Sequence, residues 1–162
     1  MPLIVNGWTL LFHDQILNQI RNLAAARDRA QAANAEGFRS NASVRTLASI
    51  AKLVRRVIPM NPGHTDYRIG NTMGPDYRHW YRGKFGQRFR LFYRFDSSAK
   101  IIVFAWVNDE GTLRARGSRS DPYHVFKAML DRDNPPDEWS KLLESGKDLP
   151  DDLLRAFEDA PG

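Results

Sequence analysis

The stretch that decides the fold is HWYRGKFGQRFRLFYRFDSSAKIIVFAWV, residues 79–107. It holds three runs that are rich in aromatic and β-branched residues: His79–Phe85, Arg88–Phe95 and Lys100–Val107. Only Gly86-Gln87 separates the first two runs, and only Asp96–Ala99 separates the next two. Because links this short join neighbouring antiparallel strands, the stretch predicts a three-stranded meander.

Upstream of the meander, the sequence predicts one strand and two helices. Gly7–Phe12 is a short aromatic run typical of a strand. Apolar residues then recur at helical spacing over His13–Ala35 and over Ala42–Val57, where Asn41 or Ser43 can cap the second helix. Residues 59–78, with three prolines and three glycines, predict a long irregular loop.

Downstream, Asp121 and Pro122 predict the start of a third helix that ends near Arg132. The element order β-α-α-β-β-β-α indicates an α+β fold, with a small antiparallel sheet packed on two N-terminal helices. The helices cover one face of the sheet, so we expect the other face to be wet or to hold a ligand. We assign residues 1–136 to this domain and residues 137–162 to an acidic, partly helical tail.

Charge is unevenly divided along the chain. Residues 1–132 carry 21 lysines and arginines against 10 carboxylates, whereas residues 133–162 carry 3 against 9. A basic body of this kind is typical of a protein that binds a polyanion. The acidic tail either folds back over the basic surface or packs on the body as a plain helix.

The composition excludes several kinds of site. There is no cysteine, so disulfides, thiolate metal sites and cysteine nucleophiles are excluded. No histidine spacing fits a metal site, and we expect neither a metal nor another cofactor. The N-terminus does not resemble a signal peptide, and the longest apolar stretch, Ile101–Val107, is too short to span a bilayer. We therefore expect a cytoplasmic protein without membrane association.

Alternation along the strands gathers basic side chains on one face of the predicted sheet. In the second run, Phe89, Leu91, Tyr93 and Phe95 point toward the helices, and Arg88, Arg90 and Arg94 point the other way with Phe92. In the first run, Trp80, Arg82 and Lys84 share a face. A hairpin that aligns these sets presents one surface carrying Trp80, Arg82, Lys84, Arg88 and Arg90.

Such a surface suits single-stranded RNA. Like charges on neighbouring strands cost stability, so their clustering favours a bound anion. Arginine binds phosphate through two parallel charge-assisted hydrogen bonds, and aromatic rings beside it provide stacking platforms for unpaired bases. The simpler interpretation is a solvated face whose basic residues keep the protein soluble. His79 and His124 are candidate proton-transfer groups, although the sequence favours a surface or capping role for each of them.

Five blocks of the sequence resemble the YhaV toxins, which belong to the RelE-like superfamily of type II toxin–antitoxin systems. These blocks are Val5–Trp8, Trp80–Gly86, Arg88–Arg94, Trp106–Arg114 and Gly117–Phe126. The resemblance implies a RelE-like fold and an endoribonuclease that cuts mRNA on the ribosome and so inhibits translation. It also implies a cognate PrlF-type antitoxin with an AbrB-like fold, and a toxin–antitoxin complex that binds the operator DNA of its own operon.

The resemblance also implies roles for individual residues. Arg82 and Lys84 match a pair of basic residues on the strand after the long loop, Arg90 matches an arginine of the next strand, and Tyr123 matches a tyrosine of the C-terminal helix. Arg114, Arg116 and Arg119 compete for the place of a further arginine, and the YhaV pattern favours Arg114. The predicted catalytic set is therefore Arg82, Lys84, Arg90, Arg114 and Tyr123. The predicted RNA-binding set is His79, Trp80, Arg88, Arg94, Arg116 and Arg119.

The expected reaction is metal-free attack of an RNA 2′-hydroxyl on the neighbouring phosphate. Arginines would stabilise the charge of the transition state, with Tyr123 or an arginine as the acid. Lys84 would act as the base, because Arg82 and Arg90 lower its pKa. One alternative is a non-catalytic RNA- or DNA-binding module that uses the same face. Another is a protein-interaction domain that docks an acidic partner there.

Overall fold

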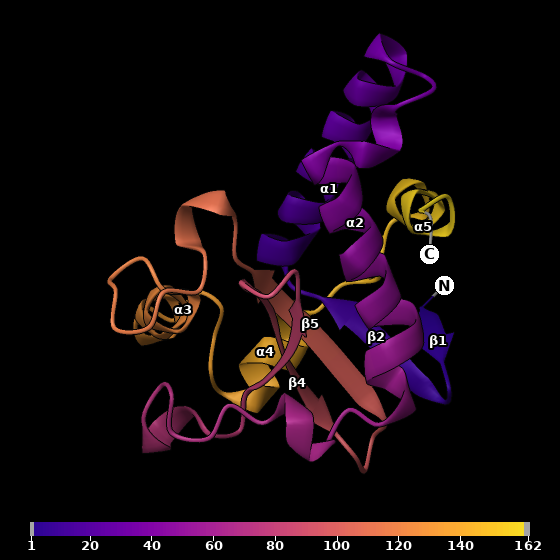
Figure 1. Cartoon of the computed structure of the whole chain (residues 1–162). Coiled ribbons are helices and arrows are strands. Elements are labelled where there is room, and N and C mark those ends of the chain that lie inside the picture. Colours follow the sequence, from indigo (N-terminus) through magenta and orange to yellow (C-terminus); the bar gives the residue numbers. More distant parts are fainter. Residues whose placement is uncertain (1, 161–162) are drawn as a thin grey trace.

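A five-stranded sheet in the order β1-β2-β5-β4-β3 forms the centre of the computed structural model, which describes residues 2–160 (Figure 1). β3 (Tyr81–Phe85), β4 (Phe89–Asp96) and β5 (Ile101–Val107) form the predicted antiparallel meander. β2 (Trp8–Phe12) runs parallel to β5, so the sheet is mixed rather than purely antiparallel. β1 (Leu3–Val5), a strand that the sequence pattern does not predict, pairs with β2 at the edge.

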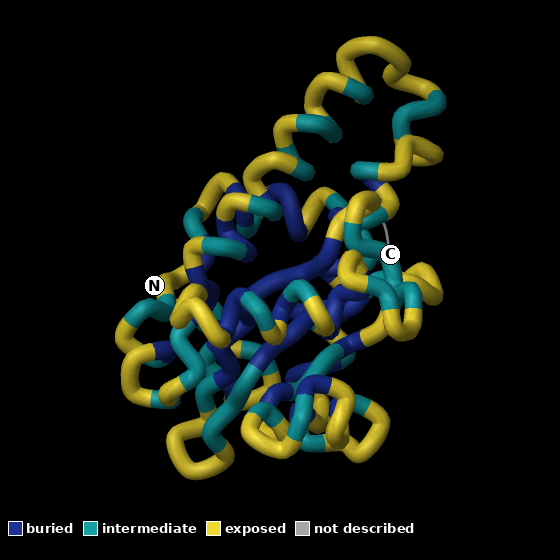
Figure 2. The backbone as a smooth tube through the Cα atoms, turned by 90° about the vertical axis from the view of Figure 1, so that its left-hand side faces the viewer, coloured by how far each residue is buried: buried dark blue, intermediate teal, exposed yellow. Residues whose placement is uncertain are grey.

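One face of the sheet is covered by α1 (Asp14–Ala33), α2 (Ala42–Lys52) and α5 (Asp151–Glu158). The side chain of Asn41 accepts hydrogen bonds from two backbone N–H groups of the first turn of α2, which confirms one of the two predicted caps. α2 continues through a π-helical turn, Leu53–Val57, to a 3₁₀ turn, Ile58–Met60. Beyond the sheet, α1 and α2 project as a helical hairpin whose tip is exposed (Figures 1 and 2).

The other face of the sheet is covered too over β4 and β5, so the expectation that this whole face is wet or holds a ligand is wrong. α3 (Pro122–Asp131) and α4 (Trp139–Ser145) pack there in a second core. The ring of Phe126 stacks 4.4 Å from Phe92 and 5.7 Å from Trp106, measured between centroids. β4 and β5 present apolar side chains on both faces, and the second set must also be removed from water.

The acidic tail contributes to both cores over its described residues. Leu142 of α4 is buried against α3, whereas Leu153 and Phe157 of α5 are buried beneath α1 and α2. Between these helices, the backbone of Lys147 exchanges hydrogen bonds of 2.8 and 2.9 Å with Phe12 of β2. α5 thus packs on the body as a plain helix, on the face opposite to α3 and α4. Within residues 2–160, no helix has the length and apolar character that a membrane span requires.

Candidate active site

The register of the β3–β4 hairpin places three cations on one surface. Arg82 faces Phe92 and Lys84 faces Arg90 as cross-strand partners, so Arg82, Lys84 and Arg90 project from the same side of the sheet, as the sequence predicts. The intervening Gly83 lies on the opposite side, facing the helices. A Cβ added there would lie 3.2 Å from methyl groups of Leu53 and Ile58. A glycine at this position therefore lets β3 pack closely on the end of α2.

Tyr123 lies at the centre of this group of cations. It belongs to the first turn of α3 and is buried. Its hydroxyl oxygen accepts hydrogen bonds from Nε of Arg82 at 2.8 Å and from Nε of Arg90 at 3.2 Å. Because both arginines act only as donors, the hydroxyl proton of Tyr123 points to neither of them and can be donated to a third group.

The two arginines are held in fixed positions by backbone carbonyls. Arg90 is only 7% exposed, and its Nη1 donates to the carbonyls of Gln87 and Phe89 at 2.8 and 2.9 Å. Nη1 of Arg82 donates to the carbonyl of Asp66, in the long loop before β3, at 2.7 Å. Within residues 2–160, Nη2 of neither arginine takes part in a hydrogen bond, so each keeps donors for a phosphate.

Arg114 is the loop arginine that the structure brings to Tyr123. Its guanidinium carbon lies 4.7 Å from the centroid of the Tyr123 ring, and its Nη1 donates to Oδ1 of Asp121 at 2.6 Å. Arg116 and Arg119 are exposed farther along the loop. Sequence spacing alone does not decide which of the three arginines joins the cluster, and in the structure it is Arg114 that contacts Tyr123.

Two polar residues support the cluster without having been predicted for it. Asp121 caps α3 as expected, but it also accepts hydrogen bonds from Arg114 and from the backbone of Ala115, and so ties the loop to the helix. Asn108 accepts from the backbone N–H of Arg90 at 2.7 Å and donates to the carbonyls of Arg88 and Thr112. A polar residue directly after a buried strand is the only sequence signal for Asn108.

Lys84 is the exposed cation of the cluster. The positive charge of Arg82 lowers the pKa of the Lys84 amine below its ordinary value, and partial desolvation and Arg90 lower it further. Like charges nearby favour the neutral amine, which is the form that accepts a proton. The direction of this shift agrees with the sequence-based expectation.

The predicted RNA-binding residues lie in different surroundings. The exposed position expected for Trp80 is wrong, because this side chain is fully buried and its indole N–H donates to Asp137 at 2.8 Å. Trp80 precedes the first residue of β3, so strand alternation does not reach it. Arg94 is half-buried beside the rings of Trp80 and Trp139, and its Nη1 donates to the carbonyl of Asp137 at 2.5 Å.

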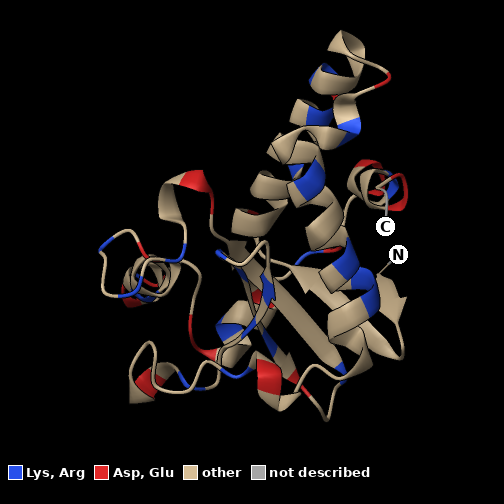
Figure 3. Cartoon of the chain, viewed as in Figure 1, with Lys and Arg blue, Asp and Glu red and all other residues tan. Residues whose placement is uncertain are grey.

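His79 and Arg88 remain exposed. The imidazole Nε2 of His79 lies 2.6 Å from the carboxylate of Asp137. Arg88 lies in the hairpin turn rather than in β4, and its Nε donates to the carbonyl of Arg114 at 3.0 Å. In Figure 3, blue ribbon marks the lysine and arginine positions along α2, in the β3–β4 hairpin and in the loop before α3.

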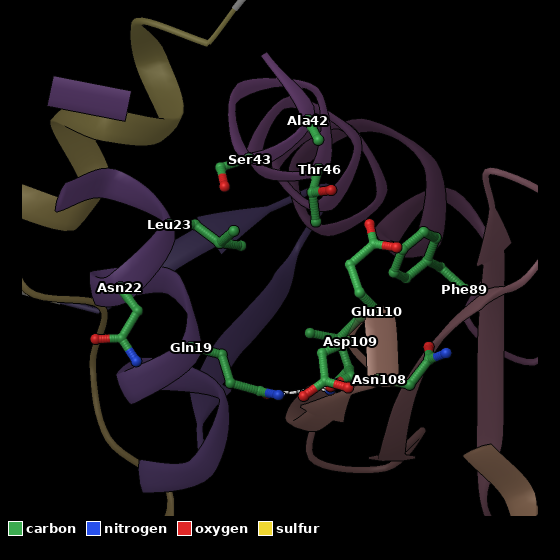
Figure 4. Close-up of a pocket in the computed structure, with 11 residues that line it drawn as sticks. Gln19, Asn22, Leu23, Ala42, Ser43, Thr46, Phe89, Asn108, Asp109 and Glu110 are labelled. Carbon is green, nitrogen blue, oxygen red and sulfur yellow. Dashed lines mark hydrogen bonds between the residues drawn. The ribbon is translucent and has the colours of Figure 1, made fainter. Parts of the chain in front are cut away.

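A cavity of about 280 Å³ lies apart from this cluster, between α1, α2 and the turn after β5 (Figure 4). Its lining includes Leu23, Phe89, Asp109 and Glu110, and none of the predicted site residues. Gln19 crosses its floor and exchanges two hydrogen bonds with the backbone of Val107. Within residues 2–160, no group of three or more histidines and carboxylates is arranged to hold a metal ion.

The fold and the site define a small α+β protein with a cluster of one lysine and three arginines built around a tyrosine hydroxyl. Residues 10–147 match a family of toxins described as having endonuclease activity within a toxin–antitoxin system. The chain belongs to this family, the YhaV toxins. A toxin of such a system has an antitoxin as its partner.

Named relatives agree with this assignment over most of the chain. Toxin YhaV of Escherichia coli O6:H1 (strain CFT073) is 35% identical over 145 residues, covering 88% of this chain and 94% of the relative. Ribonuclease toxin YhaV of Escherichia coli (strain K12) is 36% identical over 143 residues, covering 87% of this chain and 93% of the relative. No solved structure matches the chain.

Proposed function

We propose that this protein is an endoribonuclease toxin that cuts mRNA through the cluster around Tyr123. The observation that carries the proposal is the pair of hydrogen bonds from Arg82 and Arg90 to the Tyr123 hydroxyl, at 2.8 and 3.2 Å. They fix the oxygen, leave its proton available and place two guanidinium groups beside it. This arrangement suits a reaction in which a phosphate gains negative charge while a leaving oxygen needs a proton.

In the proposed reaction, neutral Lys84 removes the proton of an RNA 2′-hydroxyl. The 2′-oxygen forms a bond to the adjacent phosphorus, and the bond from phosphorus to the 5′-oxygen breaks. Tyr123 donates its proton to the departing 5′-oxygen, and the products carry a 2′,3′-cyclic phosphate and a 5′-hydroxyl. Arg82, Arg90 and Arg114 stabilise the charge on the phosphorane-like transition state, a role that guanidinium groups can fill without a metal.

The ribosome enters the proposal through positioning. The pKa of Lys84 is lowered chiefly by the charge of Arg82. A lysine amine, whose ordinary pKa is about 10.4, is nevertheless a weak choice of general base near neutral pH. Holding the 2′-hydroxyl in line with the phosphate can offset a weak base, and a bound message on the ribosome provides such alignment. In this proposal, cleavage of ribosome-bound mRNA stops translation and growth. The protein would therefore act in the cytoplasm.

The regulatory partner in this proposal is a PrlF-type antitoxin with an AbrB-like fold. The complex of toxin and antitoxin would bind the operator DNA of its own operon. Coexpression should yield one complex that binds this DNA, and toxin alone should not bind it specifically.

The test is mapping of RNA 5′ ends with and without ribosomes, for wild type and for Arg82→Ala. We expect new 5′-hydroxyl ends from the wild type in translating mixtures, and a loss of at least tenfold in Arg82→Ala, since each positioned charge contributes a large factor. Equal cleavage by both proteins would overturn the site assignment. Salt-dependent RNA binding without cleavage or growth arrest would favour the alternative, a non-catalytic binding module.

A further inference from the structure

A second cavity opens directly beside the cluster. It has a volume of about 270 Å³ and lies between the loop before α3 and the first turns of that helix. Arg114 and Tyr123 belong to the proposed catalytic cluster and also line this cavity. The remaining lining residues are Thr72, Arg116, Gly117, Ser118, Asp121, His124 and Lys127. A ligand held there would therefore continue directly from a phosphate bound at Arg114.

The charges around this cavity favour an anionic ligand. Arg114, Arg116 and Lys127 contribute three cations, whereas the carboxylate in the wall belongs to Asp121. That carboxylate is buried and accepts hydrogen bonds from Arg114 and from the backbone of Ala115 and Tyr123. Three cations against this one carboxylate leave the lining with a net positive charge, although Lys127 also pairs with Asp131 on α3.

The other lining groups suit the edge and the face of a nucleobase. The hydroxyls of Thr72 and Ser118 and the exposed imidazole of His124 provide donors, acceptors and a flat ring. Gly117 has a φ of +82°, and nothing lies within 4 Å of the position its Cβ would take, so this wall stays open. The volume lies just below the roughly 300–1,000 Å³ typical of small-ligand sites, as expected for one unit of a longer chain.

We propose that this cavity is the subsite for one nucleotide next to the cleaved phosphate. The proposal rests on the proposed ribonuclease function. The base lies against His124, and the next phosphate of the RNA chain lies between Arg116 and Lys127. The cavity therefore contributes to RNA affinity and selects the base at one position beside the cut.

The chain offers a matched pair of lysines for the test. Lys127 pairs with Asp131 within α3 at 3.2 Å, and Lys141 pairs with Glu138 at the start of α4 at 4.0 Å. Both are exposed, and of the two only Lys127 lines the cavity. Lys127→Gln and Lys141→Gln thus remove the same charge from comparable helix positions.

The probe is a set of short single-stranded RNAs that carry a 2′-O-methyl group at the cleavage nucleotide, so that binding is measured without cleavage. We expect Lys127→Gln to weaken binding several-fold and to reduce the slope of log affinity against log salt by about 0.7, the value of one single-strand phosphate contact. Lys141→Gln should keep the wild-type slope. Equal slopes for both variants would overturn the phosphate contact.

A second measurement addresses the base. Cleavage positions in a pool of mRNAs are compared for wild type and His124→Ala in a translating extract. We expect the base preference to change at one position adjacent to the cut and to persist elsewhere. An unchanged preference in a cleaving variant would refute the subsite and leave the ribonuclease function intact. If the wild type bound RNA tightly through Lys127 but never cleaved it, the nucleotide subsite would stand and the ribonuclease function would be refuted.

Discussion

At Tyr123 the hydroxyl and the ring have different partners. The hydroxyl accepts from Arg82 and Arg90, and the ring lies under the guanidinium group of Arg114. Removal of the hydroxyl in Tyr123→Phe keeps the ring and its cation–π contact but removes the proposed acid. We expect the cleavage rate to fall by about 10²–10⁴-fold, the usual contribution of a positioned acid.

A modified substrate separates the two roles of the Tyr123 hydroxyl. A 5′-sulfur leaving group needs no protonation, so an RNA with a 5′-phosphorothiolate linkage should restore most of the rate in Tyr123→Phe. An equal loss on both substrates would mean that the hydroxyl only positions the arginines.

Lys84 provides a pH-dependent prediction. Its pKa is lowered first by Arg82, so Arg82→Gln should raise this pKa toward the ordinary value of about 10.4. A base acts when deprotonated, and the rate therefore rises with pH up to its pKa. The rising limb of the pH–rate profile should move to higher pH in Arg82→Gln. A lower rate with an unmoved limb would show that Lys84 is not the base.

Residue positions on the regular strands are predictable from sequence, and those off the strands are not. Alternation places Arg82, Lys84 and Arg90 together because β3 and β4 pair residue by residue around Gly83. Trp80 lies outside that regularity, before β3 begins, and it is buried. The choice of Arg114 depends on Asp121, seven residues later, whose bond to Arg114 no periodicity indicates.

At the scale of elements, the start of α1 depends on a histidine. Nδ1 of His13 accepts a hydrogen bond from the backbone N–H of Gln15 at 3.1 Å, which only the neutral ring can do. Burial lowers the pKa of His13 below its usual value, and Lys147 lowers it further against the opposing effect of Asp14. Below about pH 6.5 the unfolded state therefore binds more protons, and stability falls as the pH falls toward the folded pKa.

Substitution of His13 by Asn retains an N-cap acceptor and removes the titration. We expect the free energy of unfolding of the wild type to decline from pH 7.5 to pH 5.5 more than that of His13→Asn, measured by urea denaturation at both pH values. If the free energy of unfolding fell equally in both proteins, His13 would be excluded as the source of the pH dependence. His13→Ala should cost about 0.5–2 kcal/mol at pH 7.5, since it loses the cap altogether.

Element boundaries are predicted well where a local signal sets them. Asn41 and Asp121 cap their helices as expected, because their short side chains reach the free N–H groups of the first turn. The second core is missed, although the run Ile101–Val107 has no polar alternation and so indicates a strand buried on both faces. The parallel pairing of β2 with β5 joins segments about ninety residues apart, and no local pattern specifies it.

At the scale of the whole molecule, the acidic tail is a structural element. Phe157 is 2% exposed beneath α1 and α2. We expect Phe157→Ala to cost about 3–5 kcal/mol, a large share of the stability of a small domain. Glu158→Ala, at the exposed neighbouring position, should cost little. Thermal melts of the two variants and growth assays on expression provide the comparison.

The same packing gives the expected result of truncation. Removal of residues 137–162 should lower toxicity, because it exposes apolar surface in both cores and unfolds the domain. A truncated protein that folds and is more toxic than the full chain would show instead that the tail restrains the active surface.

The placement of α5 beneath α1 and α2 also has a consequence for timing. Every residue of the proposed catalytic cluster is synthesised before Asp151, yet the core behind the sheet closes only when α5 arrives. Until residues 151–158 have been synthesised and have folded onto the body, the apolar side chains of α1 and α2 that α5 covers remain exposed to water.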